Sequence, residues 1–144
     1  MKKLIPFLFV ALAAFIACDD DDDKGAFIND TIKSYIETKY PGSVLRKAEY
    51  EKSGLLEVEF IHDSLIKDAY FKSDNSWVYT EWDVRTASLP QVVTDAVKNT
   101  YPDYLIDSAD YIESPEGDYY KLELEKGNIE KLLFVSPNGE VVSE

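Results

Sequence analysis

Cysteine, histidine and methionine are almost absent from this chain of 144 residues, which contains one of each. With Cys18 alone, no intrachain disulfide can form. Most zinc sites take three or four histidine or cysteine ligands, which Cys18 and His62 cannot supply. The sequence also has no glycine-rich loop of the kind that cradles phosphates. We therefore expect no cofactor and no metal site.

The same scarcity limits catalysis. Lipidation of Cys18, argued below, would remove the one thiol nucleophile, and a Ser-His-Asp triad would have to use His62. Asp63-Ser64 follows His62 at a predicted turn, and neighbours in sequence do not form a triad. We interpret His62 as an exposed turn histidine and expect no catalytic residue.

Basic residues are also few. The chain has 15 Lys and Arg against 28 Asp and Glu, which gives a formal net charge of −13. Nucleic-acid binding needs clustered Lys and Arg to replace phosphate counterions, so this balance argues against it. It also argues against docking of the folded part on anionic lipid. With 45% hydrophobic and 13% aromatic residues, the chain can build the core of one domain.

The apolar run at residues 4–17 is shorter than the roughly 20 residues that a membrane-spanning helix needs. It follows Lys2 and Lys3 and ends in Phe15-Ile16-Ala17-Cys18. This ending resembles the lipobox of bacterial lipoproteins, although Phe15 stands where the pattern usually has leucine. The resemblance identifies residues 1–17 as a lipoprotein signal peptide and Cys18 as the lipidation site. The alternative is an ordinary secretory signal with a chance cysteine.

Residues 18–26 are predicted to form an acidic spacer. The five adjacent carboxylates at 19–23 repel one another and favour a solvated segment. They lack the glycine and glutamate positions of a calcium loop. An acidic run directly after the cysteine resembles the export signal of surface-exposed lipoproteins in the Bacteroidota. We expect a protein of the cell envelope that is lipid-anchored to the outer membrane, either periplasmic or surface-exposed.

One segment occurs twice. The sequence Ile36-Glu-Thr-Lys-Tyr40-Pro41 returns as Val97-Lys-Asn-Thr-Tyr101-Pro102, 101 − 40 = 61 residues later. Each copy ends an amphipathic helix, because proline lacks an amide hydrogen and disfavours helical geometry in the residue before it. We predict one helix over residues 29–40 and a second that starts at Ser88, where Gln91 completes a capping box. The tyrosine rings are expected to pack each helix end onto a sheet.

Strand-like sequence follows each helix. Alternation predicts strands at 47–51, 56–60, 65–72 and 77–84, and matching runs follow the second helix, with Phe134 matched to Phe71 at 134 − 71 = 63. The folded domain, residues 27–144, is thus two repeats, 27–86 and 87–144. A half of about 60 residues buries too little surface to be stable alone. We therefore expect an α+β fold in which two helix-plus-four-strand units share an antiparallel meander, with both helices on one face.

The order of these features resembles the PepSY-like, β-lactamase-inhibitor-like (BLIP-like) family. It rests on the duplicated Tyr-Pro helix ends, the Leu89-Pro90 helix start and the Asn75-x-Trp77 turn, and it covers residues 27–144. The resemblance implies a curved sheet whose open face binds a partner. It does not imply β-lactamase inhibition, because the chain lacks disulfide cysteines and matches none of that inhibitor's contact residues.

We therefore interpret the chain as a non-catalytic, lipid-anchored envelope module that binds or inhibits a partner, which would be a protein or an extended polymer. Two alternatives stay open. One is a carboxylate-dependent hydrolase, whose paired acids cannot be recognised among so many. The other is a purely structural envelope protein.

Strand alternation assigns the candidate site, because successive side chains point to opposite faces of a sheet. Facing the helices, we expect Leu56, Val58, Phe60, Phe71 and Val78. The opposite face would then carry Glu57, Glu59, Tyr70, Trp77, Tyr79 and Glu81, and from the second half Tyr119, Lys121, Glu123, Leu133, Val135 and Val142. Exposed Trp and Tyr most often anchor interfaces. We predict a partner site centred on Trp77 and Tyr79 that includes Tyr70, Glu57, Glu59, Tyr119 and Lys121.

Overall fold

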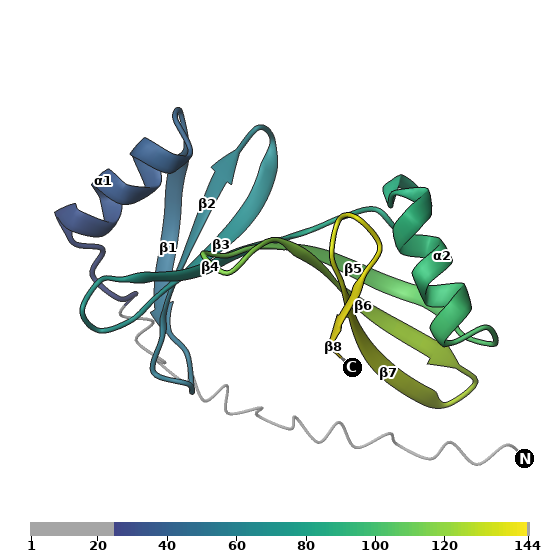
Figure 1. Ribbon diagram of the computed structural model, residues 1–144. Helices are drawn as coiled ribbons and strands as arrows, with labels where there is room; N and C mark the ends of the chain where they lie inside the picture. The colour runs from purple at the N-terminus through teal and green to yellow at the C-terminus, as the bar shows by residue number, and fades with distance from the viewer. Residues whose placement is uncertain (1–24, 144) are drawn as a thin grey trace, which may run out of the picture.

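The computed structural model describes residues 25–143, and they form two helices and one antiparallel sheet of eight strands (Figure 1). The strands lie in sequence order, so every connection is between neighbours. This confirms the expected α+β meander. Neither helix in this part of the chain is long and apolar enough to cross a membrane. The elements are α1 (Asp30–Lys39), β1 (Val44–Tyr50), β2 (Leu56–His62), β3 (Leu65–Phe71), β4 (Trp77–Asp83), a 3₁₀ turn η1 (Thr86–Ser88), α2 (Gln91–Thr100), β5 (Leu105–Glu113), β6 (Tyr119–Lys126), β7 (Ile129–Val135) and β8 (Val141–Ser143).

Both helices lie on the same face of the sheet, at opposite ends of it (Figure 1). The strand register shows why, because residues directly paired across strands point to one face. One such row runs through Ala48, Val58, Ala69, Thr80 and Glu113, from β1 into the second repeat. We call the side on which this row lies the helix face and the other side the open face.

Each helix has its own core. The α1 core is made of Ile32, Ile36, Tyr40, Ala48, Leu56, Val58, Phe60, Ala69 and Phe71. The α2 core is made of Leu89, Val93, Ala96, Val97, Ala109, Leu122, Leu124, Leu133 and Val135. Helix residues at three- and four-residue spacing thus meet alternate residues of three strands, the pattern that amphipathic sequence predicts.

The duplicated tyrosines are structural, as expected. Tyr40 is only 4% exposed and its ring centroid lies 5.0 Å from that of Phe60. Tyr101 is partly buried against the α2 core. Each tyrosine ends its helix, with its backbone N–H donating to the carbonyl of Ile36 or Val97.

The repeat extends to the irregularities of the sheet. A β-bulge between Leu45 and Lys47 returns between Ile106 and Ser108, 61 residues later. After the β5–β6 hairpin the offset grows, since 122 − 58 = 64 relates Leu122 to Val58 in the two cores. Bulges increase local twist and bend a strand, so both halves bend their sheets at matching places.

The start of α2 differs from the prediction. Ser88 belongs to the 3₁₀ turn, and α2 begins at Gln91 with Pro90 at its N-cap and no side-chain capping bond. Proline disfavours helical geometry in the residue before it, and Leu89 is accordingly extended, at φ −63° and ψ 140°. The predicted capping box of Ser88 and Gln91 is therefore wrong.

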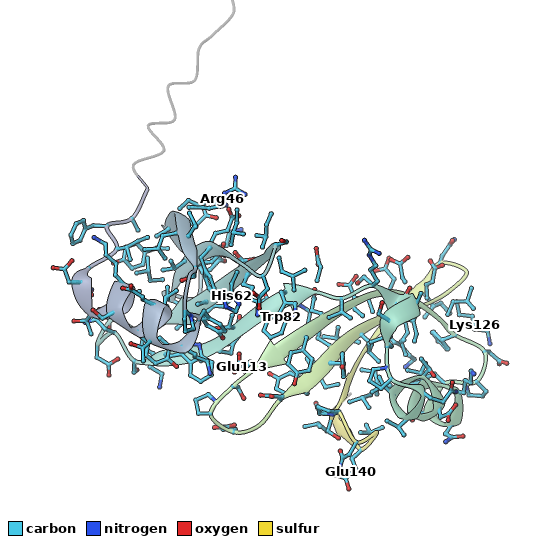
Figure 2. All side chains as sticks on the ribbon, turned by 90° about the horizontal axis from the view of Figure 1, so that it is seen from above. Arg46, His62, Trp82, Glu113, Lys126 and Glu140 are labelled. Carbon is cyan, nitrogen blue, oxygen red and sulfur yellow. The ribbon has the colours of Figure 1, made fainter. Side chains whose placement is uncertain are left out.

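A carboxylate from the second repeat holds α1 of the first. Glu113 accepts hydrogen bonds from Lys39 Nζ at 2.7 Å and from the Tyr40 hydroxyl at 2.6 Å. Burial opposes its charged form, but the bonds from Lys39 and Tyr40 outweigh it and hold the pKa of Glu113 below its usual range. Glu113 lies at the middle of the molecule, near Trp82 and between the two helices (Figure 2).

We predict that this contact couples the two repeats. Glu113→Gln and Tyr40→Phe should each lower the free energy of unfolding by about 1–3 kcal/mol, since both groups are partly buried and one is charged. In a double-mutant cycle followed by urea unfolding, the pair should show a coupling energy of about 1 kcal/mol or more. The control is Glu116→Gln, which removes a carboxylate from the exposed β5–β6 hairpin. Strict additivity of the two changes would contradict the prediction.

Candidate partner-binding face

The open face is covered by neither helix and carries most of the predicted site. Register places Glu57, Tyr70 and Tyr79 in one cross-strand row of this face. A second row holds Glu59, Asp68, Glu81, Ile112 and Tyr119, and Lys121 lies in a third row with Asp83, Asp110 and Phe134. The face assignments of Glu57, Glu59, Tyr70, Tyr79, Tyr119 and Lys121 are therefore confirmed, whereas their binding role stays a prediction.

Trp77 lies on the other face, which corrects the prediction. Its ring centroid is 5.7 Å from that of Tyr35 on α1, and Lys39 Nζ lies 4.4 Å above the ring. Its indole N–H donates to the Thr80 hydroxyl at 2.9 Å. The cause is a bulge in β4: Tyr70 pairs with Tyr79 but Phe71 pairs with Trp77, which leaves Val78 as the extra residue. Val78 is for this reason not the helix-facing residue we expected.

Leu133 and Val135 were also assigned to the wrong face. Both are fully buried in the α2 core, and Phe134 between them lies on the open face with its ring centroid 5.7 Å from that of Tyr119. The match of Phe134 to Phe71 at offset 63 was one residue short of the true offset of 135 − 71 = 64. A slip of one residue moves every side chain of a strand to the opposite face. Phe134 is thus an open-face aromatic that the sequence reasoning missed.

His62 differs from its interpretation as an exposed turn residue. It is the last residue of β2, on the helix face, and its ring centroid lies 5.4 Å from that of Tyr40. Its side chain is 17% exposed, and Nδ1 lies 3.4 Å from Asp63 Oδ2. Packing against Tyr40 accounts for the residue without a catalytic role.

Stacked tyrosines form the centre of the open face. The rings of Tyr70 and Tyr79 stack with centroids 4.3 Å apart. The Tyr70 hydroxyl lies 3.0 Å from Glu81 Oε1 and 3.3 Å from Glu57 Oε2, so one phenolic proton is shared between two carboxylates. Burial, together with these negative neighbours, raises the pKa of Tyr70 well above its usual range.

The carboxylates around this stack are crowded. Burial, and then a hydrogen bond with Glu51 and repulsion from neighbouring acids, raise the pKa of Glu57 to about 7. Burial and repulsion from Glu59 and Glu81 raise the pKa of Asp68 to about 6. These groups share their strands with few cations, so each carboxylate resists the ionisation of the next.

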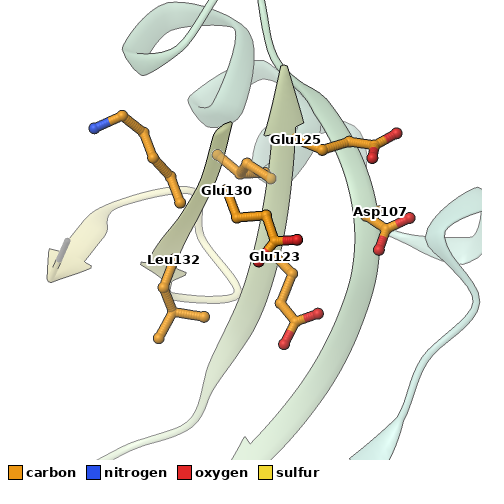
Figure 3. A pocket seen from close by; sticks show the side chains of 7 residues that line it. Asp107, Glu123, Glu125, Glu130 and Leu132 are labelled. Atoms are coloured by element: carbon orange, nitrogen blue, oxygen red, sulfur yellow. The ribbon is translucent and has the colours of Figure 1, made fainter. Parts of the chain in front are cut away.

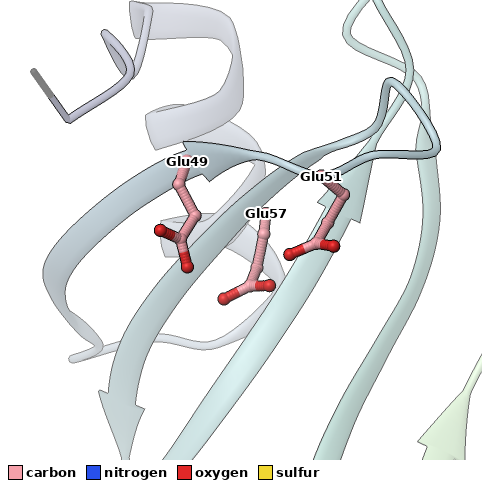
Figure 4. Close-up of side chains that lie close together, drawn as sticks. All are labelled: Glu49, Glu51 and Glu57. Atoms are coloured by element: carbon pink, nitrogen blue, oxygen red, sulfur yellow. The ribbon is translucent and has the colours of Figure 1, made fainter. Parts of the chain in front are cut away.

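Figure 4 shows the tightest group, in which carboxylate oxygens of Glu49, Glu51 and Glu57 all lie within 4.8 Å of one another. Calcium takes six to eight oxygen ligands in a site shaped around it. These three side chains stand side by side on β1, the following turn and β2, at an open surface. Three surface carboxylates therefore do not make a metal site by themselves. Glu57 lines neither of the two cavities described next, so its raised pKa does not identify it as a general acid.

Two hollows adjoin the open face. The larger, about 550 Å³, lies where β4 separates from the second repeat, before the pair Thr80–Glu113. Its walls include Val78, Tyr79, Tyr119, Val142, the hairpin at 114–118, Lys72 and also Trp77, which borders the cavity although its ring packs on the helix face. Val142 lies at the bulge of β8 that repeats the Val78 bulge of β4. The smaller, about 310 Å³, is lined by Asp107, Glu123, Leu124, Glu125, Glu130, Lys131 and Leu132 (Figure 3). The larger one combines aromatic and aliphatic walls with polar rims, as binding sites do.

Comparisons with known proteins agree with this architecture. A family model described as "Putative beta-lactamase-inhibitor-like, PepSY-like" matches residues 55–142, more than half of the chain. The search of curated proteins finds no match.

Solved structures from three Bacteroides species share the fold. A BLIP-like protein from Bacteroides fragilis is 21% identical, with a TM-score of 0.72 over 86% of this chain and 89% of that chain. A DUF2874 family protein from Bacteroides ovatus is 20% identical, with a TM-score of 0.69 over 83% and 87%. A protein from Bacteroides eggerthii, described as "putative periplasmic", is 17% identical, with a TM-score of 0.66 over 82% and 88%. At such identities the likeness is one of fold.

The crowding of acids gives a pH prediction. The pKa of Glu57 is raised from 4.5 to about 7 in the folded protein, so folding takes up a proton there between these values. The free energy of unfolding is therefore undiminished by Glu57 below pH 4.5, where the carboxyl is protonated in both states, and it falls as the pH rises through 7, where the folded protein must give up this proton. Glu57→Gln should therefore stabilise the protein at pH 8, by about 1 kcal/mol after allowance for solvent screening, and leave it unchanged at pH 4. The measurement is urea unfolding across this range, with Glu37→Gln on the exposed side of α1 as control. A gain at pH 4 equal to that at pH 8 would contradict it.

Proposed function

The chain belongs to the PepSY-like, beta-lactamase-inhibitor-like family, and from this we propose that it is a non-catalytic module that binds or inhibits a protein partner on its open face. The observation that carries the proposal is the pair of open-face aromatics Tyr79 and Tyr119, which line a cavity of about 550 Å³; Phe134 packs against Tyr119, and the buried Tyr70, 8% exposed, stacks on Tyr79. Aromatic side chains that border a hollow are the usual anchors of interfaces.

The arrangement of the face supports a binding role over a purely structural one. A sheet face that needs only solvation would carry polar side chains, yet aliphatic residues are exposed here at Ile61 (36%) and Ile66 (50%), paired across β2 and β3. Leu132 on β7 adds another at 40%. Apolar side chains distributed with tyrosines over an uncovered face are typical of an interaction surface.

We predict that removing two open-face tyrosines abolishes partner binding. Tyr79→Ala with Tyr119→Ala should weaken binding by about 2 kcal/mol or more, because both rings border the larger cavity. The protein would serve as bait in an envelope extract, and binding of the recovered partner would then be measured by calorimetry. The matched control is Phe27→Ala with Tyr50→Ala, which removes two aromatics that are 79% and 69% exposed elsewhere. Unchanged affinity in a folded Tyr79, Tyr119 variant would refute the proposal, and the absence of any specific partner would favour a structural role.

The proposal also includes the anchor. Cys18 and residues 1–24 lie outside the described residues, so the lipobox resemblance is the support for lipidation. The folded part begins beside the sheet, since the Ala26 N–H donates to the Ala48 carbonyl on β1. The acidic segment would then connect an acylated Cys18 in the outer membrane to a domain exposed in the envelope.

Metabolic labelling tests the anchor. A labelled fatty acid should enter the wild-type protein and should be absent from Cys18→Ala, and the wild type alone should fractionate with the outer membrane. Ser53→Ala, in the turn before β2, serves as the control substitution and should be labelled like the wild type. Equal labelling of wild type and Cys18→Ala would show that the cysteine is not the lipidation site.

A further inference from the structure

We propose that the open face recognises a basic protein surface, whose lysine and arginine side chains pair with the acidic rows while a neighbouring apolar side chain enters the cavity beside Tyr79 and Tyr119. This inference rests on the proposed function and adds the chemistry of the partner. It follows from three features of the face: the register of its acids, the shortage of internal cations, and the position of the cavity.

The acids stand directly opposite one another across the strands. Glu59 on β2 pairs with Asp68 on β3, and Asp68 pairs with Glu81 on β4. Glu49 pairs with Glu57 in the next row, and Asp83 with Asp110 at the junction of the repeats. Like charges in directly opposite positions destabilise a sheet. A soluble sheet face has no need of this arrangement, because mixed charges would solvate it equally well.

The protein's own cations neutralise these acidic rows only in part. Arg46 Nε lies 3.3 Å from Glu59, and Lys47 Nζ lies 3.3 Å from Glu49. Lys121 serves both Asp110, at 2.8 Å, and Glu81, at 3.3 Å.

Glu57 and Asp68 lie between the acids that Arg46 and Lys47 pair with and those that Lys121 pairs with. Within residues 25–143, neither of these two carboxylates has a cation within 4.0 Å. Asp68 Oδ1 is buried and has no hydrogen-bond partner in this part of the chain. An unpaired buried acceptor costs free energy, so the carboxylate of Asp68 is destabilised in the free protein.

The helix face shows that the fold can pair a carboxylate when stability requires it. Glu113 has both an ammonium and a hydroxyl donor within 2.7 Å. On the open face, by contrast, Glu57 and Asp68 have no cation within 4.0 Å among the described residues, and burial, followed by the neighbouring acids, raises their pKa values. Cations of a partner would pair with these acids and would steer its approach to a chain of net charge −13.

The cavity adds specificity to this attraction. Tyr79 pairs with Tyr70 and so stands beside the acidic rows, and it also forms one wall of the cavity of about 550 Å³. Val78 and Val142 give the cavity apolar walls, and Glu116, Asp118 and Lys72 are its charged lining residues. A surface with basic residues around a protruding apolar side chain would satisfy both parts together.

The test uses paired charge removals of equal composition. One variant carries Glu57→Gln and Asp68→Asn on the open face, and the other carries Glu37→Gln and Asp95→Asn on the exposed sides of α1 and α2. The open-face variant should fold at least as stably as the parent, since it relieves repulsion. The probe is a peptide of about nine residues in which lysine and valine alternate, since valine favours an extended backbone. The matched probe has glutamate in place of each lysine.

We expect the lysine peptide to bind the parent, with an affinity that falls as salt rises. The open-face variant should bind it about tenfold more weakly, while the helix variant binds like the parent. Equal losses in both variants would show attraction by net charge alone and would overturn the inference. Failure of the lysine peptide to bind the parent, or equal binding of the glutamate peptide, would overturn it as well.

The envelope partner separates this inference from the proposed function. A partner that loses affinity with Tyr79→Ala and Tyr119→Ala but not with Glu57→Gln and Asp68→Asn would leave the binding function standing and refute the basic surface. A partner insensitive to the tyrosine changes would refute the open face as the binding site, whatever the peptide does.

Discussion

The contact of Glu113 with Lys39 and Tyr40 links the two halves of this protein outside the strand pairing. The sheet joins the repeats only through β4 and β5, whose register includes the four pairs from Thr80–Glu113 to Asp83–Asp110. Backbone bonds of one strand pair leave such a joint free to twist. A carboxylate from β5 that binds the end of α1 adds a second attachment on the helix face. The buried Lys67, whose Nζ lies 3.7 Å above the Trp82 ring, fills the space beside it.

The pairing of β4 with β5 also makes the open face continuous from one repeat to the other. Because Glu113 and Thr80 pair on the helix face, Glu81 and Ile112 pair on the other side, and the acidic row continues toward Tyr119 in the second repeat. The repeats therefore form one continuous open surface rather than two. A partner that spans it would contact residues from both halves, and the larger cavity is likewise built from both.

Sequence reasoning found the repeat because its signals are local. Proline after Tyr40 and Tyr101 ends a helix whatever surrounds it, and Leu56, Val58 and Phe60 alternate on a strand without irregularity. It failed where one extra residue changes the alternation. The bulge at Val78 moved Trp77 to the helix face, and the one-residue error in matching β7 exchanged Phe134 with Leu133 and Val135. Bulges depend on how two strands pair, and that information is not in either strand alone.

The partition of charge between the two faces can be explained by selection for binding. Folding this chain requires two apolar cores and the Glu113 contact, all on the helix face, so residues of the open face are free of that constraint. Acids placed opposite acids on such a face lower stability, and proteins retain destabilising arrangements chiefly where function uses them. The hydroxyl of Tyr70 shares its proton between Glu57 and Glu81 and so keeps these two carboxylates in place. An interface that brings positive charge to this row would convert the repulsion of the free protein into affinity for its partner.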